Sequence, residues 1–332
     1  MRVIGISLGI YAVLLVGLHL GWGIRLPYGP AVLGYVLISA AVSVIDRRRA
    51  VVRGVVPDVR LPTSGPIGKT GQVGLIAAFT LSGLVALLNP WQARQMVRQM
   101  TGNARAKRRL ARARAAAEAG PDGDPTALPR RARYTLPFDG EWLVYNGGPD
   151  PATSHSWDVI AQRFAFDFVR ADDAGRRHTG RGTRLDEYFA WGEPIRAAAP
   201  GEVVRVVDGI RDAPAVGWGL VDVGARDFVG NHVVVRHAEG EFGLYAHLVP
   251  GSIRVAEGDR VERAVHLGDC GHSGHSSEPH LHFHLQDGPE MHDSLGLRIA
   301  FSNLRIDGVP HAESELRWGQ RVCAEHDRPG AH

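Results

Sequence analysis

The segment at residues 280–284 combines residue types and a spacing that could do chemistry. It reads His280-Leu281-His282-Phe283-His284, with an imidazole at every second position. Alternate residues of a β-strand share a face, so this spacing predicts that the three histidines point one way and the two apolar residues point into a core. One imidazole could then hold a metal while its neighbour transfers a proton. A solvent-facing polar strand is the alternative interpretation, and three histidines on one face make it the weaker one.

Two further segments lie close to this strand in the sequence. Residues 243–248 form an apolar run that contains His247 near its end. Residues 268–279 are rich in glycine and serine and lead directly into the histidine strand. A turn of this composition can bring backbone amides close to a substrate. We interpret His272 and His275, which lie in it, as parts of a tight connection.

Taken in order, these segments and their neighbours resemble the lysostaphin-type zinc metallopeptidases, which cut peptidoglycan cross-bridges. The resemblance spans about residues 140–305. Its motifs are Asn231-His-Val-Val-Val-x-His237, Tyr245-Ala-His247-Leu, Val255-x-x-Gly258-Asp-x-Val261 and Ser277-x-Pro279-His280-Leu-His282-Phe283. The resemblance implies a zinc-dependent endopeptidase with a Zn²⁺ cofactor and a peptidoglycan peptide as substrate. It also implies an antiparallel β-sandwich or barrel-like domain.

The resemblance assigns roles to individual residues. It implies that Asp167 and His282 are metal ligands. His247 and His280 correspond to the catalytic histidines that orient or deprotonate the attacking water and stabilise the oxyanion. Which of these two histidines performs which task stays open.

The sequence departs from the family pattern at Arg163, four residues before Asp167, where the family usually has its first histidine ligand. A guanidinium stays protonated and has no lone pair to offer a metal. His155, in a Ser-His-Ser-Trp segment similar to that of a divergent branch of the family, is the candidate substitute, and His178 is a second candidate. The predicted metal ligands are therefore His155, Asp167 and His282.

Other functions remain to be weighed against a peptidase. Arg163 favours a catalytically degenerate relative that binds or regulates cell-wall enzymes. A metal-storage protein would explain the many histidines but not the ordered motifs. A lipoyl- or biotinyl-like carrier is excluded, because such a carrier needs a modifiable lysine and none follows Lys107.

The pattern along the chain predicts the domain organisation. From residue 134 onward, short apolar or alternating runs are separated by Gly, Pro and Asp, which indicates a mainly β domain. We assign residues 134–322 to the peptidase domain and residues 323–332 to a tail. Residues 92–133 form a basic stretch followed by a Pro/Gly/Ala linker.

The first 91 residues are expected to form a membrane segment. Residues 3–22 contain no formal charge and are long enough to span a bilayer, and shorter apolar runs follow at residues 29–45 and 73–91. We therefore predict about three transmembrane helices, and a multi-pass protein of the cell membrane with its peptidase domain on the extracytoplasmic side.

Charge is distributed unevenly between the two parts of the chain. Residues 1–134 have 19 basic and 5 acidic residues, whereas residues 135–332 have 19 and 30. An acidic domain argues against nucleic acid as a partner, and a basic first part favours an anionic membrane surface.

Overall fold

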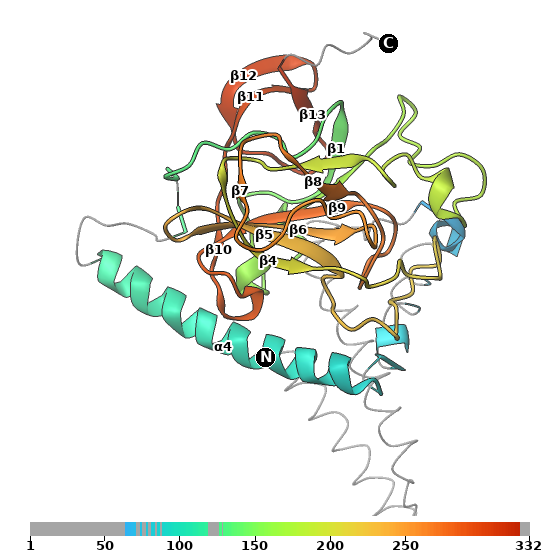
Figure 1. The fold of residues 1–332 in the computed structure, drawn as a ribbon, viewed down its shortest axis with the longest axis horizontal. Coiled ribbons are helices and arrows are strands. Elements are labelled where there is room, and N and C mark those ends of the chain that lie inside the picture. The colour runs from blue at the N-terminus through green and yellow to red at the C-terminus, as the bar shows by residue number, and fades with distance from the viewer. Residues whose placement is uncertain are drawn as a thin grey trace, which may run out of the picture. The chain divides into compact units, whose positions relative to one another are not determined.

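A computed structural model describes residues 64–70 and 88–118, some positions between these two ranges, and residues 126, 127 and 129–325. The chain falls into two compact units, Met1–Asp58 and Val59–His332. All the described residues belong to the second unit. It contains one long helix and thirteen strands among them (Figure 1).

The elements follow one another in this order: the short 3₁₀ turn η1 (Pro66–Thr70), α4 (Pro90–Glu118), β1 (Trp142–Asn146), η2 (Ile160–Gln162), β2 (Phe166–Val169), η3 (Leu185–Glu187), β3 (Pro194–Arg196), β4 (Gly201–Val207), β5 (Asn231–Ala238), β6 (Glu241–Leu248), β7 (Arg260–Val261), β8 (His266–Asp269), β9 (Leu281–Gln286), η4 (Met291–Asp293), β10 (Gly296–Leu297), β11 (Phe301–Ile306), β12 (Val309–Ser314) and β13 (Arg321–Ala324).

Eleven of the strands form one antiparallel sheet in the order β12-β11-β13-β1-β2-β9-β6-β5-β4-β7, with β10 paired to β9. Strands β3 and β8 form a second, two-stranded sheet. One hydrophobic core joins the two sheets, since Ile195 of β3 and Leu267 of β8 belong to the same buried cluster as Phe283 of β9. The prediction of a mainly β, antiparallel domain is confirmed.

Strand β9 lies near the middle of the large sheet and follows the alternation that its sequence predicts. Its residues Leu281, Phe283 and Leu285 are fully buried in the core. The intervening side chains of His282 and His284 therefore lie on the opposite face. Polar side chains on a central strand are costly to bury unless they are hydrogen-bonded, which is the first sign that this face is a site and not part of the core.

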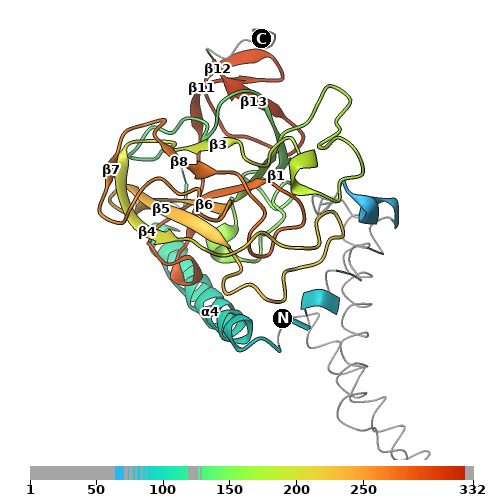
Figure 2. The ribbon, with the colours of Figure 1, turned by 45° about the vertical axis from the view of Figure 1, so that its right-hand side comes forward.

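Helix α4 lies along one side of the β domain (Figure 2). It is held by polar contacts and by the packing of Ala106 and Leu110 on Ile160 and Leu295. Gln92 is fully buried, and its amide donates to the backbone oxygens of Asp222 and Ala225 at 2.7 and 3.0 Å. One turn further along, the Gln95 side-chain oxygen accepts a hydrogen bond from the backbone N–H of Phe228 at 2.9 Å. The basic stretch that we expected to precede a linker is thus a helix docked on the β domain.

Near its middle, α4 approaches the β domain closely. A Cβ atom placed on Gly102 would lie 2.0 Å from the backbone oxygen of His292, so only glycine fits at this crossing. Beyond it, Asn103 exchanges hydrogen bonds with the backbone of Asp158 and Ile160 at 2.9 and 2.8 Å. The helix is therefore fixed against the same loops that surround the histidine strand.

The described residues include no helix that is both long and apolar enough to cross a membrane. Of the predicted spans, residues 3–22 and 29–45 lie outside the described residues, and residues 73–91 are described only in part. The boundary at residue 322 falls inside β13, which continues to Ala324 and pairs with β11.

Candidate metal centre

Strand register brings the first two candidate ligands together. Strands β2 and β9 are antiparallel neighbours, and Asp167 lies directly opposite His282. Side chains of directly opposed residues share a face of the sheet and contact one another. The His282 Nδ1 atom lies 2.9 Å from Asp167 Oδ1, and both side chains are buried.

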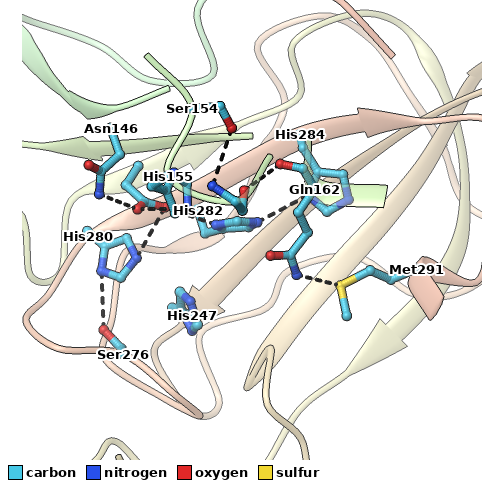
Figure 3. A network of polar contacts seen from close by, with 12 residues as sticks. Asn146, Ser154, His155, Gln162, His247, Ser276, His280, His282, His284 and Met291 are labelled. Carbon is cyan, nitrogen blue, oxygen red and sulfur yellow. Dashed lines mark hydrogen bonds and ion pairs between the residues drawn. The ribbon is translucent and has the colours of Figure 1, made fainter. Parts of the chain in front are cut away.

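The third candidate ligand, His155, reaches this pair from the loop between β1 and η2. Its Nε2 atom lies 3.4 Å from Asp167 Oδ2. One ligand atom from each of His155, Asp167 and His282 lies within 4.8 Å of the other two. Among the described residues, they are the one such group of three or more His, Cys, Asp or Glu side chains. Figure 3 shows His155 and His282 converging from the loop and the strand.

The electrostatics of the group centre on the carboxylate of Asp167. Burial alone would raise the pKa of Asp167, but the neighbouring histidines, His155 and His280 foremost, hold it well below its ordinary value. Burial also lowers the pKa of His155, although Asp167 opposes this shift. At neutral pH the group therefore presents an ionised carboxylate beside a neutral imidazole of His155, which is the protonation that metal binding requires.

The two predicted catalytic histidines lie beside the group. His280 donates from Nδ1 to the backbone oxygen of Glu278 at 2.7 Å, and its Nε2 lies 3.6 Å from Asp167 Oδ1. His247 donates from Nδ1 to the backbone oxygen of Ser273 at 2.7 Å. Their ring centroids are 4.8 Å apart. In each neutral ring Nε2 is therefore the nitrogen with the lone pair, so both rings can accept a proton.

Burial, followed by the neighbouring His280 and His282, holds the pKa of His247 well below its ordinary value. His247 also has a left-handed backbone, with φ of 62° at the end of β6. Such a conformation is uncommon for a residue other than glycine, and it turns the side chain at the point where the strand ends. One of the two predicted catalytic histidines is thus an uncharged imidazole held in a constrained backbone.

The surroundings and the donor atoms of His155, Asp167 and His282 are suited to binding a cation. Asn146 of β1 donates from Nδ2 to Asp167 Oδ2 at 3.0 Å and so orients the carboxylate. His155 Nδ1 is buried and has no hydrogen-bond partner among the described residues. Two imidazoles and one carboxylate are a donor set that zinc takes in catalytic sites. The residues present therefore fit the metal that the sequence implies.

Arg163 does not join the metal group. Its guanidinium carbon lies 4.6 Å from the centroid of the Trp157 ring, and its Nε donates to the Trp157 backbone oxygen at 3.1 Å. The backbone oxygen of Arg163 accepts a hydrogen bond from Ser154 Oγ at 2.7 Å. These three contacts fasten the loop that carries His155, which lies between Ser154 and Trp157. The residue that replaces the usual ligand thus supports the loop of the substitute candidate.

We expect Arg163→Ala to lower the affinity of the chain for zinc by about tenfold, the lower end of what loss of a supporting contact causes at metal sites. Without the guanidinium, the loop loses its contact with the Trp157 ring and His155 is less well held. Competition with a chromogenic chelator measures the affinity. Arg176→Ala is the matched control, since Arg176 forms an exposed pair with Asp172. A folded Arg163→Ala variant with unchanged affinity would show that the loop needs no such support.

His178 lies away from the metal group, whereas His284 lies beside His282, on the face that the strand alternation predicts. The two ring nitrogens of His178 lie 2.9 and 2.8 Å from the backbone oxygens of Thr179 and Ser64, away from the metal group. His284 is fully buried, and its Nδ1 lies 3.1 Å from His282 Nε2. His284, which matched no role in the family, therefore contacts a candidate ligand directly.

The group opens into a cavity of about 320 Å³. All five predicted site residues line it: His155, Asp167, His247, His280 and His282. Met96 and Gln99 of α4 complete the wall. The helix contribution was missed because the sequence stretch around these residues suggested only a basic, solvated segment.

Comparison with known proteins identifies the class of this domain. Residues 181–293 match Peptidase family M23. This match, over about a third of the chain, confirms the lysostaphin-type resemblance for that region. His247, His280 and His282 lie inside the matched residues, whereas His155 and Asp167 precede them.

Curated relatives are similar over this part of the chain. The peptidoglycan DD-endopeptidase ShyA of Vibrio cholerae is 36% identical over 156 residues, which are 47% of this chain and 27% of the relative. The DD-carboxypeptidase/endopeptidase Mpg of Neisseria meningitidis is 33% identical over 108 residues, or 32% of this chain and 20% of the relative. The cell division protein DipM of Caulobacter vibrioides is 27% identical over 119 residues, or 36% and 16%. The chain thus spans less than a third of the length of these relatives.

Among solved structures, the M23 metalloprotease pseudoalterin is 22% identical, with a TM-score of 0.32 and coverage of 59% of this chain and 96% of that one.

Proposed function

We propose that this chain is a zinc-dependent endopeptidase that hydrolyses peptide bonds of peptidoglycan. One observation carries the proposal: donor atoms of His155, Asp167 and His282 converge in the wall of a cavity that His247 and His280 also line. Zinc bound there would supply Lewis acidity and make water acidic enough to ionise near neutral pH.

The chain's own residues supply the proton transfers. His247 and His280 each have Nδ1 committed to a backbone oxygen, so each presents Nε2 as the proton acceptor. One of them takes the proton of the attacking water and returns it to the leaving amine. The neighbouring imidazole donates to the oxyanion that forms at the scissile carbonyl. The short distance between the two rings allows them to act on the same reacting group.

The choice of substrate is supported by the activities of two relatives. ShyA is a peptidoglycan DD-endopeptidase, and Mpg is a DD-carboxypeptidase and endopeptidase. The cavity suits a flexible peptide, because Met96 and Val159 add apolar surface to a lining that also contains the histidines. A D-amino-acid-containing stem or cross-link peptide is therefore the substrate class that we assign.

Zymography on purified peptidoglycan tests the proposal. We expect the wild-type chain to clear the gel and to contain about one zinc ion per molecule, the occupancy of a single catalytic site. His282→Ala and His155→Ala are each expected to abolish clearing and to lower the zinc content. His178→Ala is the matched control, because it removes a histidine that lies outside the metal group.

Two outcomes would contradict parts of this proposal. A folded wild-type chain without zinc and without lytic activity would favour the alternative, a degenerate relative that binds or regulates cell-wall enzymes. Full activity of His155→Ala would remove His155 from the ligand set while leaving the peptidase intact.

We also propose that the chain is held in the cell membrane with its peptidase domain on the extracytoplasmic side. The apolar runs of the sequence support this, as does the outward face of α4. There Val97 and Met100 are about 60% exposed amid basic residues and without an acidic one nearby on the helix. Amphipathic basic helices of this kind bind anionic membrane surfaces. Protease treatment of intact spheroplasts should digest residues 135–325, and protection of that region would contradict the assigned side.

A further inference from the structure

A chain of buried polar side chains continues from the metal group along β9. His282 Nε2 lies 3.1 Å from His284 Nδ1, and His284 Nε2 lies 2.9 Å from Gln286 Oε1. Gln286 Nε2 in turn donates to the backbone oxygen of Gly288 at 2.8 Å. His284 and Gln286 are both fully buried. His282, His284 and Gln286, which are alternate residues of β9, thus form a row of polar side chains that contacts Asp167 at its His282 end.

The direction of every hydrogen bond in this row follows from its far end. A backbone oxygen only accepts, so the side-chain nitrogen of Gln286 must be the atom that faces the Gly288 oxygen. The other amide atom, Gln286 Oε1, then faces His284. An amide oxygen also only accepts, so the proton of the neutral His284 ring lies on Nε2. His284 Nδ1 is then the acceptor, and His282 Nε2 must donate to it.

The consequence appears at the other nitrogen of His282. With its proton on Nε2, the neutral ring has a lone pair on Nδ1, and this atom faces Asp167 Oδ1 at 2.9 Å. Two acceptors at that distance repel each other unless a cation lies between them. Without the row, the ring would instead place its proton on Nδ1 and donate it to the carboxylate.

We propose that His284 and Gln286 are positioning residues that fix the proton of His282 on Nε2 and so keep Nδ1 available as the metal-binding nitrogen. The inference rests on the proposed ligand role of His282 and adds to it two residues that determine its tautomer. Groups hydrogen-bonded to the distal nitrogen of a ligating histidine commonly set its tautomer and raise its affinity for metal.

His284→Phe tests this proposal, because phenylalanine fills the site but accepts no hydrogen bond. In the metal-free variant, ¹⁵N NMR of the His282 ring should show the proton on Nδ1, whereas the wild type should carry a proton on Nε2. The affinity for zinc, measured by chelator competition, should fall by about 10–100-fold. A loss of packing alone would lower stability without moving this proton.

His284→Gln is the matched rescue. Its amide nitrogen can donate to Gln286 Oε1 while its oxygen accepts from His282 Nε2, which reproduces the donor and acceptor order of the native row. We expect this variant to restore the proton to Nε2 and the zinc affinity to near that of the wild type. If His284→Phe does not fold, Gln286→Met removes the acceptor at the next position and is expected to move the proton in the same direction.

The outcomes separate this inference from the proposed function. A folded His284→Phe variant that keeps the His282 proton on Nε2 would overturn the positioning role, whatever the activity of the wild type. A wild-type chain that binds no zinc would instead contradict the proposed function, while the NMR comparison of metal-free proteins would still decide the role of the row.

Discussion

Replacing Asp167 by asparagine is expected to abolish peptide hydrolysis and to lower the affinity for zinc by more than about 100-fold, the upper range seen for changes outside the ligand shell. The carboxylate is the one anionic group among the three candidate ligands, and it contacts His155, His280 and His282. Asparagine has nearly the same shape but carries no charge. It also replaces one acceptor oxygen by an NH₂ group, which would face either Asn146 or His282.

Elemental analysis and chelator competition measure this effect, and zymography measures its consequence. Asp186→Asn is the matched control, because Asp186 forms an exposed pair with Arg184 at the surface. Wild-type zinc binding in a folded Asp167→Asn variant would exclude this residue as a ligand. The metal would then have to be held by a different set of side chains.

The same substitution should also change how the metal-free domain responds to pH. The pKa of Asp167 is lower in the folded chain than its ordinary value, so its ionised form stabilises the fold at pH values above that ordinary value. This contribution is lost as the pH falls through the lower, folded-state pKa. Urea unfolding of wild type and Asp167→Asn should therefore differ most at neutral pH and converge in acid.

The second large effect is expected at His247, where loss of the imidazole should reduce turnover and leave the metal in place. His247 is not in the ligand group, yet it lies beside His280 in the cavity wall. Loss of a positioned acid–base group typically costs about 10²–10⁴ in rate. Asparagine is the substitution of choice, because it tolerates the left-handed backbone at this position better than alanine does.

Turnover on a soluble cross-linked muropeptide, with zinc content measured on the same sample, gives the required pair of readouts. We expect His247→Asn to retain zinc and lose activity, in contrast to the joint loss in Asp167→Asn. The control His178→Asn should retain both. Loss of zinc in a folded His247→Asn variant would instead make His247 part of the metal-binding set.

The strand that carries the site could be predicted from the sequence because its alternation is unusually regular. Histidines at every second position, separated by leucine and phenylalanine, indicate one polar and one buried face, and the structure has both. The pairing of Asp167 with His282 came from the family resemblance. Nothing local in the sequence specifies the register of two strands more than 100 residues apart, whereas the structure places these two residues opposite each other.

Other parts of the site could not be predicted, for identifiable physical reasons. Helix α4 buries only a few apolar residues, such as Ala106 and Leu110, together with Gln92, while Val97 and Met100 are exposed. Hydrophobic periodicity, which finds helices that pack through apolar faces, does not detect this arrangement. The docking combines a small apolar cluster, in which Ala106 and Leu110 pack on Ile160 and Leu295, with side-chain amides that bond to backbone groups of the β domain. The amide contacts join segments far apart in the sequence, so no local pattern predicts them.

His284 was missed for a different reason. The alternation of the strand correctly placed it beside His282, but a histidine with no counterpart among family roles carried no function on its own. Its partner Gln286 lies two residues further along, and only the distances between the rings and the amide turn three polar residues into an ordered row.

The position of His155 has a consequence for how sequences of this kind are sorted. A search that requires a histidine four residues before the candidate ligand Asp167 would reject this chain, because Arg163 occupies that place. Yet a loop eight residues further upstream delivers an imidazole to the same carboxylate, and the arginine helps to fasten that loop. A sequence filter built on one spacing would therefore discard chains whose three-dimensional donor set is complete.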